Sequence, residues 1–130
     1  MDVLLDTHAW VWMLTNDPNL TDAARQAAKT ADVVRLSPVS VFEVAQKVRV
    51  GKWPDMEPYV DDLPQLIEGQ GILMATLTPR IATLAGHMPW PHRDPFDRLI
   101  AATALTTGAT LLSADTMFDT LEPTRLQRVW

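Results

Sequence analysis

Four acidic residues stand at the borders between apolar and polar stretches of the chain. They are Asp6, Glu43, Asp97 and Asp115. If these side chains converge in a partly buried pocket, their carboxylates repel one another and raise each other's pKa unless a positive charge lies among them. Carboxylate oxygens suit hard divalent cations, so such a cluster predicts a site for one or two Mg²⁺ or Mn²⁺ ions. Ions held in this way favour the hydrolysis of a phosphodiester bond.

Each acid also has an ordinary structural explanation as a helix cap or a turn residue. Asp6 can cap a helix that begins directly after it. Glu43 completes the pattern Ser40-x-x-Glu43, which is typical of a capping box. Asp115 lies in "SADTMF", where an aspartate commonly stabilises a turn. Taken singly, these explanations compete with a functional role, and only the convergence of all four acids favours a site.

The stretch "DPFDRLIAA" combines a helix start with one of the four acids. Asp94 has the place of an N-cap, Pro95 that of the first helical residue, and Asp97 that of the acidic third position of a capping box. Helical spacing stacks Asp97 with Ala101 and Ala104 on a face of small residues that suits close contact with a sheet. We therefore expect Asp94 to act first as the cap and Asp97 to point inward.

The elements that must position these acids follow from the hydrophobic pattern. Strands are predicted at residues 3–5, 33–36, 72–75, 110–112 and, weakly, 126–129. Helices are predicted from residue 7, over 21–29, 40–50, 78–86 and 95–107, and less regularly within 53–71. This alternation predicts an α/β fold, namely a three-layer α/β/α sandwich with a mostly parallel central sheet of four to five strands.

A parallel sheet brings the acids to one side of the molecule. The carboxyl ends of the strands and the amino ends of the helices share one edge in a right-handed βαβ array. Asp6 and Asp115 follow strands, whereas Glu43 and Asp97 open helices, so all four belong to that edge. If the winding reverses about the first strand, the first and fourth strands become neighbours and Asp6 and Asp115 flank the crevice between them.

Length and composition restrict the class of protein. The 130 residues predict one domain, spanning 1–130. The absence of cysteine excludes disulfides, thiolate nucleophiles and zinc ribbons. The sequence has no apolar run near the ~20 residues of a membrane span, and Asp2 and Asp6 interrupt any secretory signal. We therefore expect a cytoplasmic protein with no membrane partner.

The net charge of −5 argues at first against a nucleic-acid partner, because such proteins usually carry a basic face. Neutralising the four acids with metal takes this charge from −5 to −1. Several cations near the proposed edge are candidates to hold phosphates. They are Lys47, Arg49, Lys52, Arg93 and Arg98. Each has the alternative of a solvated surface charge, and Lys47 has a possible partner in Glu43 one helical turn away.

Four motifs in order carry a resemblance to a known family: "LLDTHAWVW", "SVFEVAQKVRVGK", "HRDPFDRLIAATA" and "LLSADTMF". They resemble the PIN domain, and specifically the VapC-like toxin ribonucleases of bacterial toxin–antitoxin pairs, over nearly the whole chain. The resemblance implies an endoribonuclease that depends on Mg²⁺ or Mn²⁺. It also implies an RNA substrate, a homodimer, and a cognate antitoxin protein whose tail enters the active-site groove.

The same resemblance assigns roles to individual residues. The family's acidic quartet matches Asp6, Glu43, Asp97 and Asp115. Asp6 and Asp97 correspond to the firmest metal ligands, Asp115 completes the shell, and Glu43 binds a second ion or orients water. Thr7 and Ser113 match hydroxyl positions that contact phosphate, with capping as their alternative. His92 is a candidate for a general base, but its place on a proline-rich loop, rather than the resemblance, favours a substrate or structural role.

Two other classes of protein share parts of this pattern. A phosphoaspartyl phosphatase also uses an aspartate after the first strand and Mg²⁺, but it needs a second aspartate two residues later, where this chain has His8. A PIN-fold interaction module without catalysis would use Trp12, Trp53, Tyr59 and Leu66 as a docking surface, although such aromatics are more often core. A nucleotide-binding switch is disfavoured because the sequence has no Walker loop and no Gly-x-Gly-x-x-Gly turn.

Overall fold

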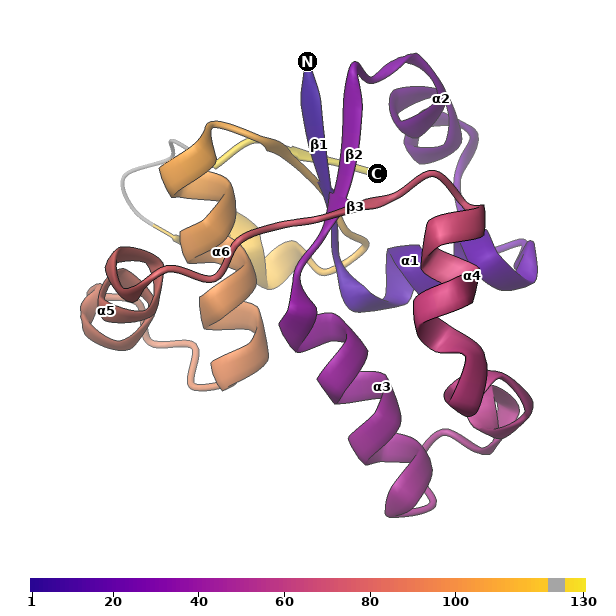
Figure 1. The fold of residues 1–130 in the computed structure, drawn as a ribbon. Coiled ribbons are helices and arrows are strands. Elements are labelled where there is room, and N and C mark those ends of the chain that lie inside the picture. Colours follow the sequence, from indigo (N-terminus) through magenta and orange to yellow (C-terminus); the bar gives the residue numbers. More distant parts are fainter. Residues whose placement is uncertain (122–125) are drawn as a thin grey trace.

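The computed structural model describes residues 1–121 and 126–130, and within them a sheet of five strands forms the centre of the molecule (Figure 1). The strands are β1 (Asp2–Leu5), β2 (Val33–Leu36), β3 (Leu73–Met74), β4 (Thr110–Leu112) and β5 (Arg128–Val129). Their spatial order is β3-β2-β1-β4-β5, and each neighbouring pair is parallel. The predicted parallel sheet is therefore confirmed, with β1 between β2 and β4 as the reversal of winding requires.

Helices cover both faces of this sheet (Figure 1). They are α1 (Thr7–Thr15), α2 (Asp22–Thr30), α3 (Pro38–Arg49), α4 (Leu63–Gly69), α5 (Pro79–His87) and α6 (Pro95–Thr107), with short 3₁₀ helices η1 (Pro54–Asp62) and η2 (Thr116–Thr120). None of the helices in the described part of the chain has both the length and the apolar character to cross a membrane.

The side chains of β1 point alternately to the two faces of the sheet, and each face carries its own hydrophobic cluster. Val3 and Leu5 face a cluster that also contains Trp10 of α1 and Val44 of α3, whereas Leu4 faces the opposite cluster with α6. Helix α5 packs on the outer side of α6 through a small cluster of its own. The result is the predicted three-layer α/β/α sandwich.

The start of α3 differs from the prediction. The helix begins at Pro38, and the Ser37 side chain caps it by accepting a hydrogen bond from the Val39 amide at 3.2 Å. Pro38 has the backbone angle that a first helical residue needs, so this earlier cap prevails over Ser40. The predicted capping box Ser40-x-x-Glu43 is therefore wrong, and Glu43 lies inside the helix instead of at its start.

Other predicted boundaries are close to those observed. Asp94 and Thr21 cap α6 and α2 through their side chains, as the sequence indicates. The irregular segment after Trp53 divides into η1 and α4 because prolines interrupt it repeatedly. The third strand is shorter than predicted, since the Ile72 amide bonds back to the Ile67 carbonyl at the end of α4.

Candidate active site

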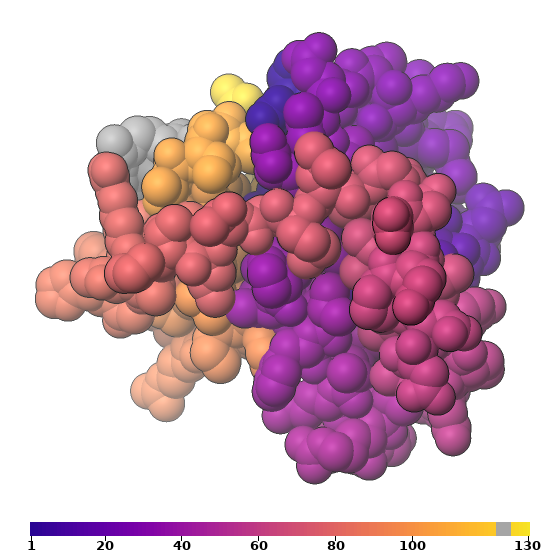
Figure 2. All heavy atoms as spheres, viewed as in Figure 1, coloured from indigo at the N-terminus to yellow at the C-terminus, as the bar shows by residue number. Residues whose placement is uncertain are grey.

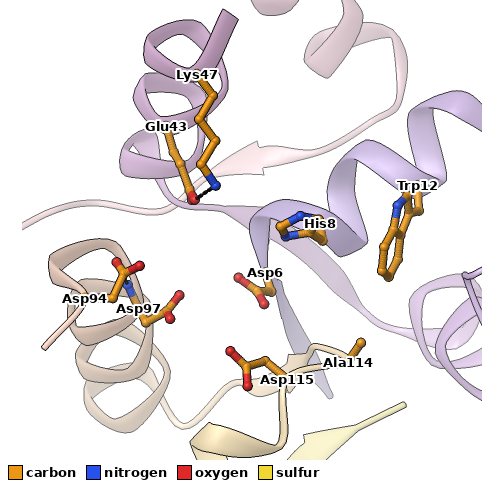
Figure 3. A pocket seen from close by; sticks show the side chains of 9 residues that line it. All are labelled: Asp6, His8, Trp12, Glu43, Lys47, Asp94, Asp97, Ala114 and Asp115. Carbon is orange, nitrogen blue, oxygen red and sulfur yellow. Dashed lines mark hydrogen bonds and ion pairs between the residues drawn. The ribbon is translucent and has the colours of Figure 1, made fainter. Parts of the chain in front are cut away.

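A cleft of about 430 Å³ opens at the carboxyl edge of the sheet (Figure 3). Its lining comes from the end of β1, from α1, α3 and α6, and from the segment after β4. The lining residues are Asp6, His8, Trp12, Glu43, Lys47, Asp94, Asp97, Ala114 and Asp115. All four predicted acids thus line one cavity, although 109 positions separate the first from the last in the 130-residue chain.

A larger groove of about 610 Å³ lies elsewhere, between α3, α4 and β3, on the face of the molecule drawn in Figure 2. Its lining is apolar apart from Glu68, with Phe42, Leu73 and Met74 among the exposed side chains. Glu68 is the one carboxylate of this lining, and its neighbours in the groove are apolar. The groove therefore lacks the group of polar side chains that catalysis needs. The smaller, acidic cleft is therefore the candidate site.

Asp6 serves two purposes at the base of this cleft. Its Oδ1 accepts a hydrogen bond from the Thr7 amide at 2.8 Å, so it does cap α1, and its Oδ2 accepts one from the Ser113 hydroxyl at 2.6 Å. Burial raises the pKa of the Asp6 carboxyl, the Glu43 charge adds to the rise, and both hydrogen bonds oppose it. Asp6 therefore caps α1 and still lines the cleft, so the two interpretations of this residue are compatible.

Glu43 is buried and is held at both oxygens. Its Oε1 accepts a hydrogen bond from Thr7 Oγ1 at 2.7 Å, and its Oε2 accepts one from Lys47 Nζ at 2.7 Å. Thr7 Oγ1 also lies 2.9 Å from Ser40 Oγ, and because a hydroxyl has one proton, Thr7 donates to the carboxylate and accepts from Ser40. The structure therefore places Thr7 behind Glu43 as its support.

Asp97 occupies the first turn of α6 and points into the cleft (Figure 3). Asp94 Oδ1 caps the helix by accepting from the Phe96 and Asp97 amides, while Asp97 Oδ2 lies 2.6 Å from His92 Nε2. Burial raises the pKa of Asp97 to about 6, the charges of Asp6 and Asp94 contribute to the rise, and the hydrogen bond with His92 opposes it.

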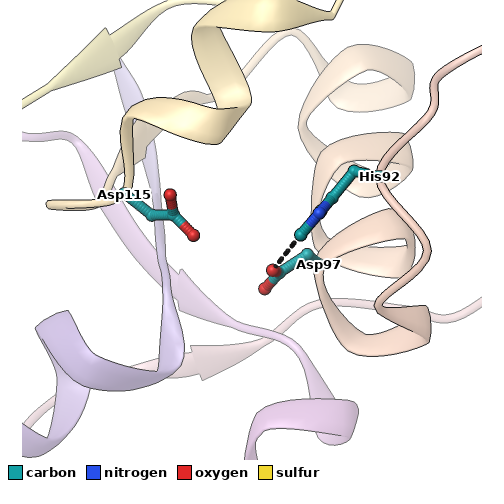
Figure 4. A group of neighbouring side chains, drawn as sticks. All are labelled: His92, Asp97 and Asp115. Carbon is teal, nitrogen blue, oxygen red and sulfur yellow. Dashed lines mark hydrogen bonds and ion pairs between the residues drawn. The ribbon is translucent and has the colours of Figure 1, made fainter.

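Asp115 completes the group from the opposite side of the cleft. It caps η2 through the Met117 amide at 2.9 Å, and its own amide donates to Ser113 Oγ at 3.0 Å. Asp115, Asp97 and His92 each offer a ligand atom, and the three atoms lie within 4.8 Å of one another (Figure 4). Oxygen donors with at most one nitrogen suit a divalent cation such as Mg²⁺ or Mn²⁺.

The predicted phosphate-binding cations have different positions. Lys47 lines the cleft and lies over the Trp53 ring at 5.4 Å from its centre. Arg98 donates instead to four backbone carbonyls between residues 85 and 92, and Arg93 lies against a separate hollow between α5 and α6. The structure therefore gives Arg98 a structural role and brings only Lys47 of this set to the acids.

Some residues of the site were not predicted. His8 stacks on Trp53 with ring centres 4.9 Å apart, and Trp12 lies 5.5 Å from His8, so α1 brings two aromatic side chains to the cleft. Their spacing could have indicated both residues. Positions 8 and 12 lie on the same face of the helix that begins directly after Asp6. Arg128 was also missed, and it supports the loop before Asp115 by donating to the Ser113 carbonyl at 2.9 Å.

Comparison with known proteins gives a consistent result. The model of the family described as "PIN domain" matches residues 3–122. Ribonuclease VapC22 of Mycobacterium tuberculosis is 33% identical over 130 residues, covering 98% of each chain. VapBC2 from Rickettsia felis, bound to a promoter DNA fragment, superposes with a TM-score of 0.69 at 16% identity and covers 98% of this chain and 97% of that one.

A toxin–antitoxin complex from Klebsiella pneumoniae superposes with a TM-score of 0.65 at 18% identity, covering 96% of this chain and 98% of that chain. At such identities the two solved structures establish the fold alone. The family model and the ribonuclease relative, by contrast, match the sequence over nearly its whole length. The chain therefore belongs to the PIN-domain family.

Proposed function

We propose that the protein is an endoribonuclease that hydrolyses RNA phosphodiester bonds in the acidic cleft, as the toxin of a toxin–antitoxin pair. The observation that carries this proposal is the meeting of Asp6, Glu43, Asp97 and Asp115 in one cavity. The 33% identity to a ribonuclease of the same length supports the choice of RNA as substrate. An RNA target would place the action of this single PIN domain, residues 1–130, in the cytoplasm.

Asp6, Asp97 and Asp115 would hold the cation, because their carboxylates line the cleft from three separate elements. Bound there, Mg²⁺ or Mn²⁺ would place positive charge beside the scissile phosphate and favour ionisation of the attacking water. Whether one ion or two bind depends on Glu43, which would ligate a second ion or orient the water. Ser113 and Thr7 would act by fixing Asp6 and Glu43, to which they donate hydrogen bonds.

Hydrolysis joins the water oxygen to phosphorus and breaks one phosphorus–oxygen ester bond, and the leaving oxygen takes up a proton. Glu43 is suited to orient the attacking water, since Thr7 and Lys47 hold both of its oxygens in place. The proton that the water releases balances the proton that the leaving oxygen takes up. Lys47 would also approach a phosphate of the substrate, because it lines the cleft beside that carboxylate. His8 and Trp12 offer aromatic surface on which an unpaired base would stack.

The charge of the same cleft also indicates which protein partner would bind there. A concentration of carboxylates suits a positively charged side chain, so an antitoxin that inserts such a residue would block both metal and substrate. The fold shared with VapBC2 and with the Klebsiella complex supports an antitoxin as the partner. We also propose a homodimer, as the resemblance to VapC-like proteins implies.

The alternative functions are not favoured. A phosphoaspartyl phosphatase would need an acid at position 8, where the structure has the histidine stacked on Trp53. A docking module built on the predicted aromatics is disfavoured at Trp53 and Tyr59, because both pack against the buried core.

Purified protein and single-stranded RNA test the proposal. We expect cleavage that requires Mg²⁺ or Mn²⁺, stops in EDTA, and falls by at least about 100-fold in Asp6→Asn and Asp97→Asn. Asp61→Asn is the matched control, because Asp61 is exposed and lies outside the cleft. Cleavage that persists in EDTA, or in either cleft variant, would contradict the mechanism.

A further inference from the structure

Arg98 of α6 binds the backbone of the segment that leads from α5 into α6. Its Nε donates to the Ala85 carbonyl at 2.7 Å, and its two terminal nitrogens donate to the carbonyls of Met88, Trp90 and His92 at 2.6, 2.6 and 2.9 Å. The planar guanidinium has five N–H donors in fixed directions, so four simultaneous bonds define the path of the loop closely. The backbone of His92 is thereby held against the helix that carries Asp97.

The side chains of the loop have a second anchor in Trp90. Its ring is buried, its Nε1 donates to Thr120 Oγ1 at 3.0 Å, and its centre lies 5.8 Å from that of Phe118. The His92 ring packs against Trp90 with centres 4.9 Å apart. Both the backbone and the ring of His92 are therefore fixed before any ligand binds.

This fixed imidazole faces Asp97 (Figure 4). When Asp97 is ionised its carboxylate only accepts hydrogen bonds, so in that state the 2.6 Å contact is a hydrogen bond that His92 Nε2 donates to Asp97 Oδ2. The bond uses one of about four lone-pair directions on the carboxylate, and the group stays able to bind a cation. The charges of Asp6 and Asp94 repel the same carboxylate, and the hydrogen bond from His92 opposes their effect.

We propose that His92 is a positioning residue, which holds the Asp97 carboxylate in the orientation that binds the divalent cation. Arg98 and Trp90 act through it by fixing the loop. A direct ligand role is the competing possibility, because His92, Asp97 and Asp115 offer atoms within 4.8 Å of one another. The positioning role is the better fit at Nε2, because that nitrogen has no lone pair for a metal while it donates its proton to Asp97. Partners that orient a ligand in this way commonly change metal affinity by about 10- to 100-fold.

Mn²⁺ affinity of the full chain, measured by calorimetry without RNA, tests the inference. We expect His92→Phe, which keeps a ring beside Trp90 but has no donor, to weaken binding by at least about tenfold. His92→Gln keeps an N–H donor and should remain within about threefold of the unmodified protein. Unchanged affinity in His92→Phe, or an equal loss in both variants, would overturn the positioning role.

Pulsed electron paramagnetic resonance of Mn²⁺ bound to the unmodified protein and to His92→Phe gives a second measurement. We expect no coupling to a directly bound nitrogen. Because His8 also lines the cleft, a coupling that is present in the unmodified protein and lost in His92→Phe would make His92 a ligand and overturn the inference. The inference rests on the proposed metal site. Failure of the unmodified protein to bind Mn²⁺ would refute that site and the inference together, whereas normal binding with an unaffected His92→Phe would refute the inference alone.

Discussion

Replacing Asp97 by asparagine should stabilise the metal-free protein at neutral pH while it removes the activity. The folded protein raises the pKa of this carboxyl from its ordinary value of 3.8 to about 6, chiefly by burial. The native state therefore binds the proton more tightly than the unfolded chain does. As the pH rises from about 4 to above 6, the native protein must ionise Asp97 against this preference, and its free energy of unfolding falls.

The size of the effect follows from the same values. A rise in pKa from 3.8 to about 6 corresponds to at most about 3 kcal/mol. The side chain is 17% exposed, and solvent screening reduces the expected gain for Asp97→Asn to about 1–2 kcal/mol. Asparagine keeps a carbonyl oxygen that can accept from His92, so the hydrogen bond itself need not be lost.

Urea unfolding in EDTA measures this gain. At pH 7.5 Asp97→Asn should be the more stable protein, and the difference should vanish near pH 4, where the native carboxyl of the unmodified protein is protonated. Asp61→Asn controls for the removal of one negative charge from a chain of net charge −5, because Asp61 is exposed. With Mn²⁺ at 100 times its dissociation constant the unmodified protein should gain about 2.7 kcal/mol and become the more stable of the two.

Two results would refute this reasoning. If Asp97→Asn is no more stable than Asp61→Asn in EDTA at pH 7.5, burial does not destabilise the ionised carboxylate. If Mn²⁺ stabilises Asp97→Asn as much as the unmodified protein, Asp97 does not contribute to the metal site.

Further predictions concern the support and the mouth of the cleft. Arg98→Met would remove a donor from four carbonyls, of which that of Met88 also accepts from the Trp90 amide, and we expect urea unfolding to show a loss of about 3 kcal/mol. A loss of RNA affinity at unchanged stability would instead restore the phosphate role that the sequence suggested. Trp12→Ala removes a ring that lines the cleft beside His8, so it should raise KM for RNA about tenfold with little change in kcat, as steady-state cleavage would show. An equal fall in kcat would indicate that Trp12 supports the acids rather than the substrate.

The general position of the site was predictable from the sequence. A parallel sheet brings every strand end to one edge, so placing Asp6 and Asp115 after strands was enough to bring them together. The start of α3 was not predictable from the sequence, because Ser37 and Ser40 both precede residues that favour a helix. Only the backbone angle of Pro38 decides between the two serines. This shift changes the interpretation of Glu43 from a cap to a buried side chain.

The role of Arg98 and the partner of His92 could not be predicted, because both depend on tertiary contacts. Arg98 bonds to carbonyls of a proline-rich loop, and no periodicity in the sequence indicates where that loop turns. The charge of Arg98 near an acidic motif favoured a phosphate contact, yet its donors are used within the protein. His92 is likewise defined by its distance to Asp97, which the spacing of five residues alone does not determine.

The hydrogen bond between Ser113 and Asp6 joins positions 107 residues apart, so the order of synthesis on the ribosome decides when the cleft can form. A nascent chain makes Asp6 early, but it lacks β4 and Ser113 until 107 further residues have been added. The base of the acidic cleft, where the Ser113 hydroxyl donates to the Asp6 carboxylate, therefore cannot assemble before residue 113 has been added. The four acids can meet only once the segment with Asp115 has left the ribosome, so the cleft is among the last parts of residues 1–121 to form.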